Sequence, residues 1–254
     1  MKLLWASLAL GVCAWAQVGP QLGQPQLGMM LAPDGSARAV LGVTGSVTLG
    51  APAASGILSL GCSKLLCLMK TDSSILSLSR AAATSAAATS AAATSNVAAA
   101  PEGPAWFSFH GDSALVYFPK LRQLARWHDN QLDPVDFDVP GEILAVRETA
   151  AGITSAVRTR GGVWIVGPGN MTLQSLPDAT GPVILLDNGV LFATPDAFIL
   201  RRPGAGDLSF PVDAVASLAW LGEHYVQAST RKSNYALRID PGAERLFVLP
   251  EPAP

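Results

Sequence analysis

The sequence is poor in charge and in cysteine. Only 14% of its 254 residues are charged, and the formal net charge is −2. The basic residues form no cluster that would neutralise a phosphate backbone, which argues against nucleic acid as a partner. Of the three cysteines, Cys62 and Cys67 have no histidine within forty residues. Two cysteines alone do not make a structural metal site.

Long apolar stretches are also scarce. The N-terminal run Leu3–Cys13 is too short to span a bilayer as a helix. Lys2 ahead of it and Ala14-Trp15-Ala16 behind it predict a signal peptide over residues 1–16, cleaved between Ala16 and Gln17. No later stretch approaches 18 apolar residues, so no membrane span is expected after cleavage. We therefore expect an exported protein, periplasmic or secreted.

An oxidising compartment would allow a disulfide between Cys62 and Cys67. If residues 62–67 form one straight strand, the odd separation places the two side chains on opposite faces. A turn at Ser63-Lys64 brings them together instead. Both arrangements are compatible with the sequence.

Catalytic signatures are missing as well. The sequence has no G-x-S-x-G motif. His110, Asp112 and Ser113 lie in one predicted turn, whereas the members of a catalytic triad converge from separate segments. We expect no catalytic residues, no metal site and no cofactor.

What the sequence does contain is a repeat of about 37 residues, and each unit ends in a short apolar strand. Four such ends lie at residues 135–140, 173–177, 208–212 and 246–250. A period of this length, with about four short strands in each unit, is typical of β-propeller blades. The predicted fold is all-β and propeller-like, with five or six blades in a ring that is irregular or incomplete. A β-sandwich is the alternative, because it also uses many short strands.

The repeat divides the chain. Residues 17–27 are an extended leader rich in Gly, Pro and Gln, residues 28–250 are the propeller-like domain, and residues 251–254 are a tail. Residues 81–100 begin with three copies of Ala-Ala-Ala-Thr-Ser. We interpret them as a low-complexity insertion in a loop, because the unit Thr44–Pro101 returns to the common period without it. Five full repeats then leave the hairpin Gly28–Val43 as half a blade.

Two segments carry a family resemblance. Leu31-Ala32-Pro33-Asp34-Gly35-Ser36-Ala37 resembles the S-P-D-G turn of the WD40-like (PD40) repeats in TolB-type bacterial β-propellers. Phe107–Tyr117 resembles a degenerate copy, with His110-Gly111-Asp112 where Pro-Asp-Gly would stand. The other repeats lack this motif, and the Gly-His and Trp-Asp pairs of WD40 repeats are absent. The resemblance implies a propeller used for protein or ligand contact, and it assigns no functional residues.

Two functions are compatible with these features. The first is an exported, non-catalytic binding or scaffold module for a protein or glycan partner, with Trp127 and His128 as candidate binding residues. The second is a secreted carbohydrate-active hydrolase that uses acids such as Asp112, Asp136 or Asp138 near Trp127. A hydrolase needs two carboxylates facing each other across a cleft. The i, i+2 spacing of Asp136 and Asp138 also fits the solvent face of an outer strand.

Overall fold

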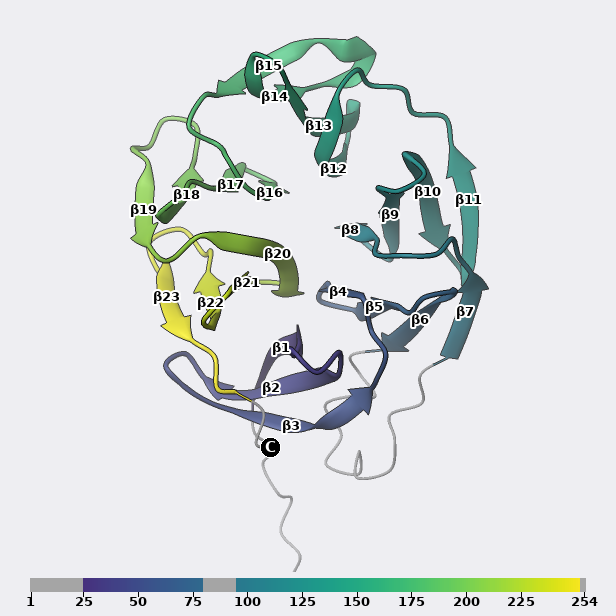
Figure 1. Ribbon diagram of the computed structural model, residues 1–254, viewed down its shortest axis with the longest axis vertical. Coiled ribbons are helices and arrows are strands. Elements are labelled where there is room, and N and C mark those ends of the chain that lie inside the picture. The colour runs from purple at the N-terminus through teal and green to yellow at the C-terminus, as the bar shows by residue number, and fades with distance from the viewer. Residues whose placement is uncertain (1–24, 80–94, 252–254) are drawn as a thin grey trace, which may run out of the picture.

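The structure is a computed structural model, and it describes residues 25–79 and 95–251. Six antiparallel sheets surround a central axis as the blades of a β-propeller (Figure 1). The predicted all-β propeller is confirmed with six blades. The β-sandwich alternative is excluded, because the sheets form a ring rather than two facing layers. The signal peptide over 1–16, the leader up to residue 24, residues 80–94 of the insertion and the last three residues of the tail lie outside the described residues.

Blades 2 to 6 each contain four strands that follow one another in the sheet, and the first strand lies nearest the axis (Figure 1). The strands of blades 2 and 3 are β4 (Ser59–Cys62), β5 (Leu66–Lys70), β6 (Ser74–Ser79), β7 (Ser95–Ala99), β8 (Trp106–His110), β9 (Ser113–Phe118), β10 (Gln123–His128) and β11 (Gln131–Val135). Those of blades 4 and 5 are β12 (Glu142–Thr149), β13 (Gly152–Thr159), β14 (Gly162–Val166), β15 (Thr172–Leu176), β16 (Val183–Leu186), β17 (Gly189–Ala193), β18 (Ala197–Arg201) and β19 (Leu208–Pro211). Blade 6 contains β20 (Val215–Gly222), β21 (Tyr225–Thr230), β22 (Asn234–Arg238) and β23 (Arg245–Val248). A short 3₁₀ turn, η1 (Pro168–Asn170), joins β14 to β15.

The ring has two faces. The connection face carries the links between blades, such as residues 55–58 between β3 and β4. The hairpin face lies opposite and carries the first hairpin turns of the four-stranded blades, such as residues 63–65 and 223–224. In blades 2 to 6 the innermost strand runs from the connection face to the hairpin face.

Within residues 25–79 and 95–251, blade 1 has three strands, β1 (Gln26–Leu31), β2 (Ala37–Val43) and β3 (Ser46–Ala54). The carbonyl of Gly35 in the β1–β2 turn accepts a hydrogen bond of 2.9 Å from Ile57 N, which places that turn at the connection face. Thr44, in the β2–β3 turn, is hydrogen-bonded at 2.8 Å to the hydroxyl of Tyr225, beside the hairpin face. β1 therefore runs in the direction of a second strand, and no strand among the described residues takes the innermost position in blade 1.

The missing strand changes how the ring is divided. The sequence predicted half a blade followed by a long unit from Thr44 to Pro101, but β3 belongs to blade 1 and the remainder forms blade 2. The innermost strands of blades 6 and 2, β20 and β4, lie beside each other although a blade stands between them (Figure 1). Their turns meet as well, because Lys64 and Glu223 form an ion pair of 3.7 Å.

Two strand positions differ from the predicted ones. The fourth strand of blade 3 is β11 at residues 131–135, not residues 135–139. Asp129 and Asn130 both have positive φ, 46° and 62°, so they form a two-residue hairpin turn that sets His128 opposite Gln131. The C-terminal end of the predicted insertion, residues 81–100, also differs from the prediction, because it contains the strand β7. β7 pairs with β6, so the loop cannot extend over the whole of residues 81–100.

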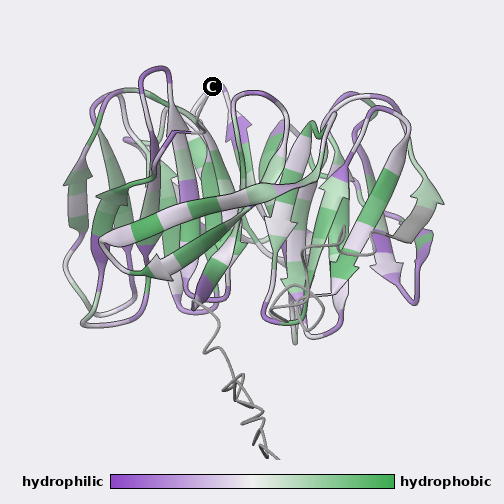
Figure 2. Cartoon of the chain, turned by 90° about the horizontal axis from the view of Figure 1, so that it is seen from below, coloured by the Kyte–Doolittle hydropathy of each residue, from purple (hydrophilic) through white to green (hydrophobic). Residues whose placement is uncertain are grey.

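Apolar side chains pack between the blades, and each of the six blade interfaces has its own hydrophobic cluster. Figure 2 shows the apolar segments along the strands inside the ring. The interface between blades 6 and 1 contains Met30 and Val40 from one side and Leu221, Tyr225 and Leu249 from the other. The ring is thus held by face-to-face packing of its sheets.

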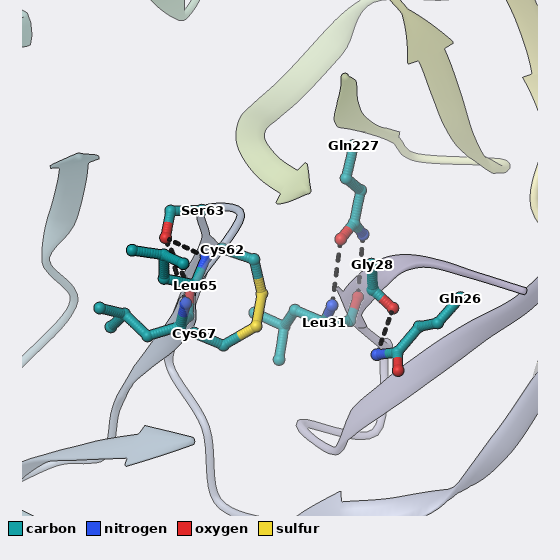
Figure 3. The surroundings of a disulfide bond; sticks show 9 residues. Gln26, Gly28, Leu31, Cys62, Ser63, Leu65, Cys67 and Gln227 are labelled. Carbon is teal, nitrogen blue, oxygen red and sulfur yellow. Dashed lines mark hydrogen bonds between the residues drawn. A yellow bond between two sulfur atoms is a disulfide. The ribbon is translucent and has the colours of Figure 1, made fainter. Parts of the chain in front are cut away.

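The two ends of the ring meet without a shared strand among the strands that the structure describes. The side-chain amide of Gln227 in β21 pairs with the main chain of Leu31 at the free edge of β1, accepting from its N–H at 3.0 Å and donating to its carbonyl at 2.9 Å (Figure 3). A Cβ on Gly28 would lie 1.6 Å from the carbonyl oxygen of Leu221. Near the hairpin face, the end of β20 therefore packs directly on the backbone of β1.

Cys62 and Cys67 form a disulfide that closes the first hairpin of blade 2 (Figure 3). They are opposite each other in the β4–β5 register. The chain turns between the two cysteines, so the arrangement with a turn at Ser63-Lys64 is the one that forms, and not the single straight strand. The hydroxyl of Ser63 accepts hydrogen bonds from Leu65 N and Leu66 N at 3.1 and 3.2 Å, which holds the turn in place.

Candidate binding cavity at the ring axis

A cavity of about 740 Å³ lies on the ring axis at the connection face. Its wall is built from the first residues of the innermost strands and from the links that precede them. The lining residues Leu58, Pro104, Glu142, Thr180 and Ala216 are exposed, so the cavity is open to solvent at this face. Its size is in the range of small-molecule sites in proteins, about 300–1,000 Å³.

The edges of the innermost strands surround the cavity. β4, β8, β12, β16 and β20 each pair with a neighbour on one side only, and their other edges face the axis (Figure 1). Edges of this kind present N–H and C=O groups that the sheet itself does not use. The cavity therefore offers hydrogen-bond donors and acceptors from several blades at once.

One side of the cavity is polar because blade 1 lacks its innermost strand. Gln227, Ser229 and Asn234 of blade 6 line the cavity on this side. They form one network, in which Gln227 Nε2 donates to Asn234 Oδ1 at 3.2 Å and Ser229 Oγ donates to the same oxygen at 2.6 Å. Gln227 is only 4% exposed; its Nε2 also donates to Ser229 Oγ at 3.2 Å, and its other hydrogen bonds are made to Leu31. Buried amides are stable only when hydrogen-bonded, which explains the network.

Aromatic and charged groups complete the wall. Trp106 and Trp220 line the cavity, and both are half-buried. Trp106 also contacts Tyr117, with ring centroids 5.4 Å apart. The charged lining residues are Glu142 and Arg158, which form an ion pair of 2.9 Å. A second guanidinium nitrogen of Arg158 donates to the Thr180 carbonyl at 3.1 Å.

A buried lysine stands behind this wall. Lys70 is opposite Ser59, a lining residue, in the β4–β5 register, and its side chain is fully buried. Its ammonium group donates to the carbonyls of Thr71 and Asp72 at 2.6 and 2.9 Å. Burial lowers the pKa of the Lys70 ammonium, while Asp72 and Glu102 act in the opposite direction. These contacts hold the turn after β5 rather than a ligand.

The residues that the sequence singled out do not line the cavity. Trp127 is only 6% exposed, because its indole belongs to the core between blades 2 and 3. It is therefore not an exposed stacking surface. His128, with a side chain 44% exposed, makes a contact of 2.6 Å with Asp133 across the β10–β11 hairpin. The two neighbouring residues thus face different surroundings and form no common site.

The acids considered for a hydrolase are placed on separate segments. Asp112 lies in the β8–β9 turn at the hairpin face, and Asp136 and Asp138 follow β11. All three are exposed, and none lines the axial cavity. Within residues 25–79 and 95–251, no three His, Cys, Asp or Glu side chains are placed to hold a metal ion. In the same residues, no helix has the length and apolar character that a membrane crossing requires.

The cavity residues are those that sequence reasoning missed. One signal was present, because Gln227 interrupts the apolar strand Tyr225-Val226-Gln227-Ala228 with a polar group that the fold buries. Its partner Leu31 lies 196 residues away, so the pattern alone could not identify it.

No protein-family model and no curated protein sequence matches the chain. Solved structures do match. One is PorZ, an essential bacterial surface component of the type-IX secretion system of Porphyromonas gingivalis, with 12% identity and a TM-score of 0.50. The match covers 89% of this chain and 38% of PorZ, so this chain spans well under half of that protein. Another is a chain of the nidogen/laminin complex, with 9% identity, a TM-score of 0.58, and coverage of 89% and 93%. At these identities the comparison shows the propeller fold alone, without a PD40 or TolB assignment.

Proposed function

We propose that this protein is an exported, non-catalytic binding or scaffold module, periplasmic or secreted, that holds a protein or glycan partner at the connection face. The observation that carries the proposal is the solvent-open axial cavity, whose wall combines free strand edges with half-buried tryptophans. Concave sites with apolar walls and a few placed polar groups are the usual binding sites of proteins.

Two further features support this function. The Cys62–Cys67 disulfide is of the kind that persists outside the reducing cytosol, in agreement with the signal peptide read from residues 1–16. Among proteins of similar fold, PorZ is a bacterial surface component, and the nidogen/laminin propeller is seen in a complex. Because fold does not determine function, these likenesses support the class of function and not a partner.

The proposal is tested by blocking the cavity. Ala216 is an exposed lining residue, so Ala216→Trp would fill the mouth of the cavity without removing a core contact. Ala205→Trp makes the same change at an exposed turn outside the cavity and serves as the control. Immobilised mature protein is incubated with envelope extract and with a glycan array. We expect at least one partner that wild type and Ala205→Trp retain and Ala216→Trp loses. Equal retention by all three proteins would contradict the proposal.

The alternative hydrolase is tested in parallel. Purified protein is assayed for turnover on a panel of glycans, together with Asp112→Ala, Asp136→Ala and Asp138→Ala. We expect no turnover, because Asp112 lies on a different segment from Asp136 and Asp138 and all three lie away from the cavity. Turnover that one of the three substitutions abolishes would establish the hydrolase and overturn the binding module.

A further inference from the structure

We propose that the axial cavity binds a neutral oligosaccharide. This inference rests on the proposed function and specifies its ligand. It follows from three properties of the wall: its balanced charge, its mixture of hydrogen-bond donors and acceptors, and its two tryptophans.

The charge of the wall favours a neutral ligand. Glu142 and Arg158 are the charged side chains among the lining residues, and they neutralise each other at 2.9 Å. Arg158 is further engaged by the Thr180 carbonyl. A charged ligand would have to leave its own charge without a partner in the cavity or break this pair, and both cost free energy.

The hydrogen-bonding groups favour hydroxyls. Hydroxyl side chains line the cavity at Ser59, Ser108, Ser217, Ser229 and Thr230. Those of Ser59, Ser229 and Thr230 already make hydrogen bonds within the protein, whereas Ser217 is exposed. The free edges of the innermost strands add main-chain N–H and C=O groups. A hydroxyl both donates and accepts, so a sugar can satisfy a wall in which donors and acceptors alternate along several strands.

The tryptophans supply the apolar part of the wall. Trp106 begins β8 and Trp220 lies in β20, so they approach the cavity from different blades. Each is half-buried, with part of its ring packed on an interblade core. Flat, partly exposed indole rings are surfaces on which the apolar faces of sugar rings can rest while the ring hydroxyls reach the polar wall.

An extended peptide fits this wall less well. Peptides that add to a sheet pair with several consecutive residues along one open edge. Here five edges converge on the axis, and the longest continuous stretches of the wall are residues 180–185 and 215–220. The Leu31 end of the sixth edge, that of β1, is already occupied by Gln227. A peptide paired with one of these edges would leave the other edges around the axis without partners.

The experiment titrates the mature, disulfide-bonded protein by calorimetry with maltotriose, cellotriose, mannotriose and chitotriose. Trigalacturonate is the acidic comparison, and a neutral serine- and alanine-containing hexapeptide is the peptide comparison. We expect at least one neutral trisaccharide to bind at least tenfold tighter than trigalacturonate and the peptide. Ala216→Trp should weaken that binding at least tenfold, and Ala205→Trp should change it less than twofold.

A second blocking variant keeps the test valid if Ala216→Trp fails to fold. Ser217→Trp fills the cavity from the next exposed lining residue, and each variant is first checked for the wild-type melting temperature. The inference is overturned if no neutral trisaccharide binds, if the acidic sugar or the peptide binds best, or if neither blocking variant weakens the sugar. Loss of a captured protein partner in Ala216→Trp, without sugar binding, would overturn the ligand class and leave the binding module standing.

Discussion

At the scale of single residues, Gln227 replaces part of the strand that blade 1 lacks. Its amide donates to and accepts from the main chain of Leu31, as a neighbouring strand would. Its other hydrogen-bonding partners, Ser229 and Asn234, fix the orientation of the amide. A single side chain thereby satisfies both groups of Leu31 that point away from β2.

We therefore expect Gln227→Ala to lower the free energy of unfolding by about 1–3 kcal/mol, because it leaves buried polar groups of Leu31 unsatisfied. Urea denaturation of the oxidised protein measures the change. Gln174→Ala is the matched control, since Gln174 is exposed in β15 and should change stability by less than about 0.5 kcal/mol. Equal stability of the two variants would show that Gln227 does not close the ring.

A second residue-scale prediction concerns acid. Three hydrogen bonds from Arg201, of 2.9, 3.2 and 2.6 Å, hold the pKa of Asp207 below its usual value of 3.8. A lowered carboxyl pKa stabilises the fold above 3.8, and this contribution is lost as the pH falls through the folded-state pKa. Because the pair is partly exposed, Asp207→Asn should cost less than about 1 kcal/mol at pH 7.

The cost of Asp207→Asn should disappear as the pH is lowered well below 3.8, because the wild-type carboxyl is then neutral too. Urea denaturation at a series of pH values tests this. Asp112→Asn is the control, since Asp112 has no ion pair among the described residues. A cost for Asp207→Asn that persists unchanged in acid would show that the ion pair is not its source.

At the scale of the elements, the contact between β1 and β20 depends on Gly28. The carbonyl of Leu221 occupies the position that a β-carbon would take, at 1.6 Å. Backbone rather than a flexible side chain stands in the way, so one strand must move. We expect Gly28→Ala to lower the free energy of unfolding by at least about 2 kcal/mol.

Gly206→Ala is the control for this substitution, because nothing lies within 4 Å of its added methyl group. We expect Gly206→Ala to leave the melting temperature within a degree or two of wild type or to raise it slightly. Differential scanning calorimetry of both variants provides the comparison. A melting temperature of Gly28→Ala equal to that of Gly206→Ala would refute the close approach of β1 and β20.

The strands also show how much of the fold could be predicted from the sequence. Local signals were sufficient for hairpins such as β16–β17, where Asp187-Asn188-Gly189 marks the turn. They were not sufficient to distinguish the first strand of a blade from the second, because both are short apolar segments, and only contacts with Ile57 and Tyr225 show which way β1 runs. β7 was missed for a related reason: its Ala-rich composition continues the preceding tract, and its pairing with β6 makes it a strand.

The candidate site was less predictable than the fold. Trp127 is a candidate from sequence because it is aromatic and ends a predicted strand. Alternate residues of a blade strand face the two neighbouring blades, however, and Trp127 packs in the core between blades 2 and 3. The cavity wall consists instead of the edges of the innermost strands, with apolar side chains, two tryptophans and a few polar groups. Such residues carry no sequence motif, because their role depends on where the ring places them.

At the scale of the whole molecule, the prediction to test is export. If residues 1–16 are a signal peptide, the mature chain begins at Gln17. N-terminal sequencing or intact mass spectrometry of protein isolated from its native compartment checks this. Retention of Met1 on a cytosolic protein with reduced Cys62 and Cys67 would contradict export and with it the proposed role outside the cytosol.

The seam between blades 1 and 6 has a consequence for the order in which the molecule is made and folded. β1 is the first strand to be synthesised, but Gln227, which pairs with it, follows 196 residues later. In a growing or translocating chain, the Leu31 end of β1 stays without this partner until Gln227 has emerged. Contacts this distant in sequence form slowly. β1 therefore gains its last contacts late in folding. Until then the inner edge of β1 is unpaired and can pair with another strand.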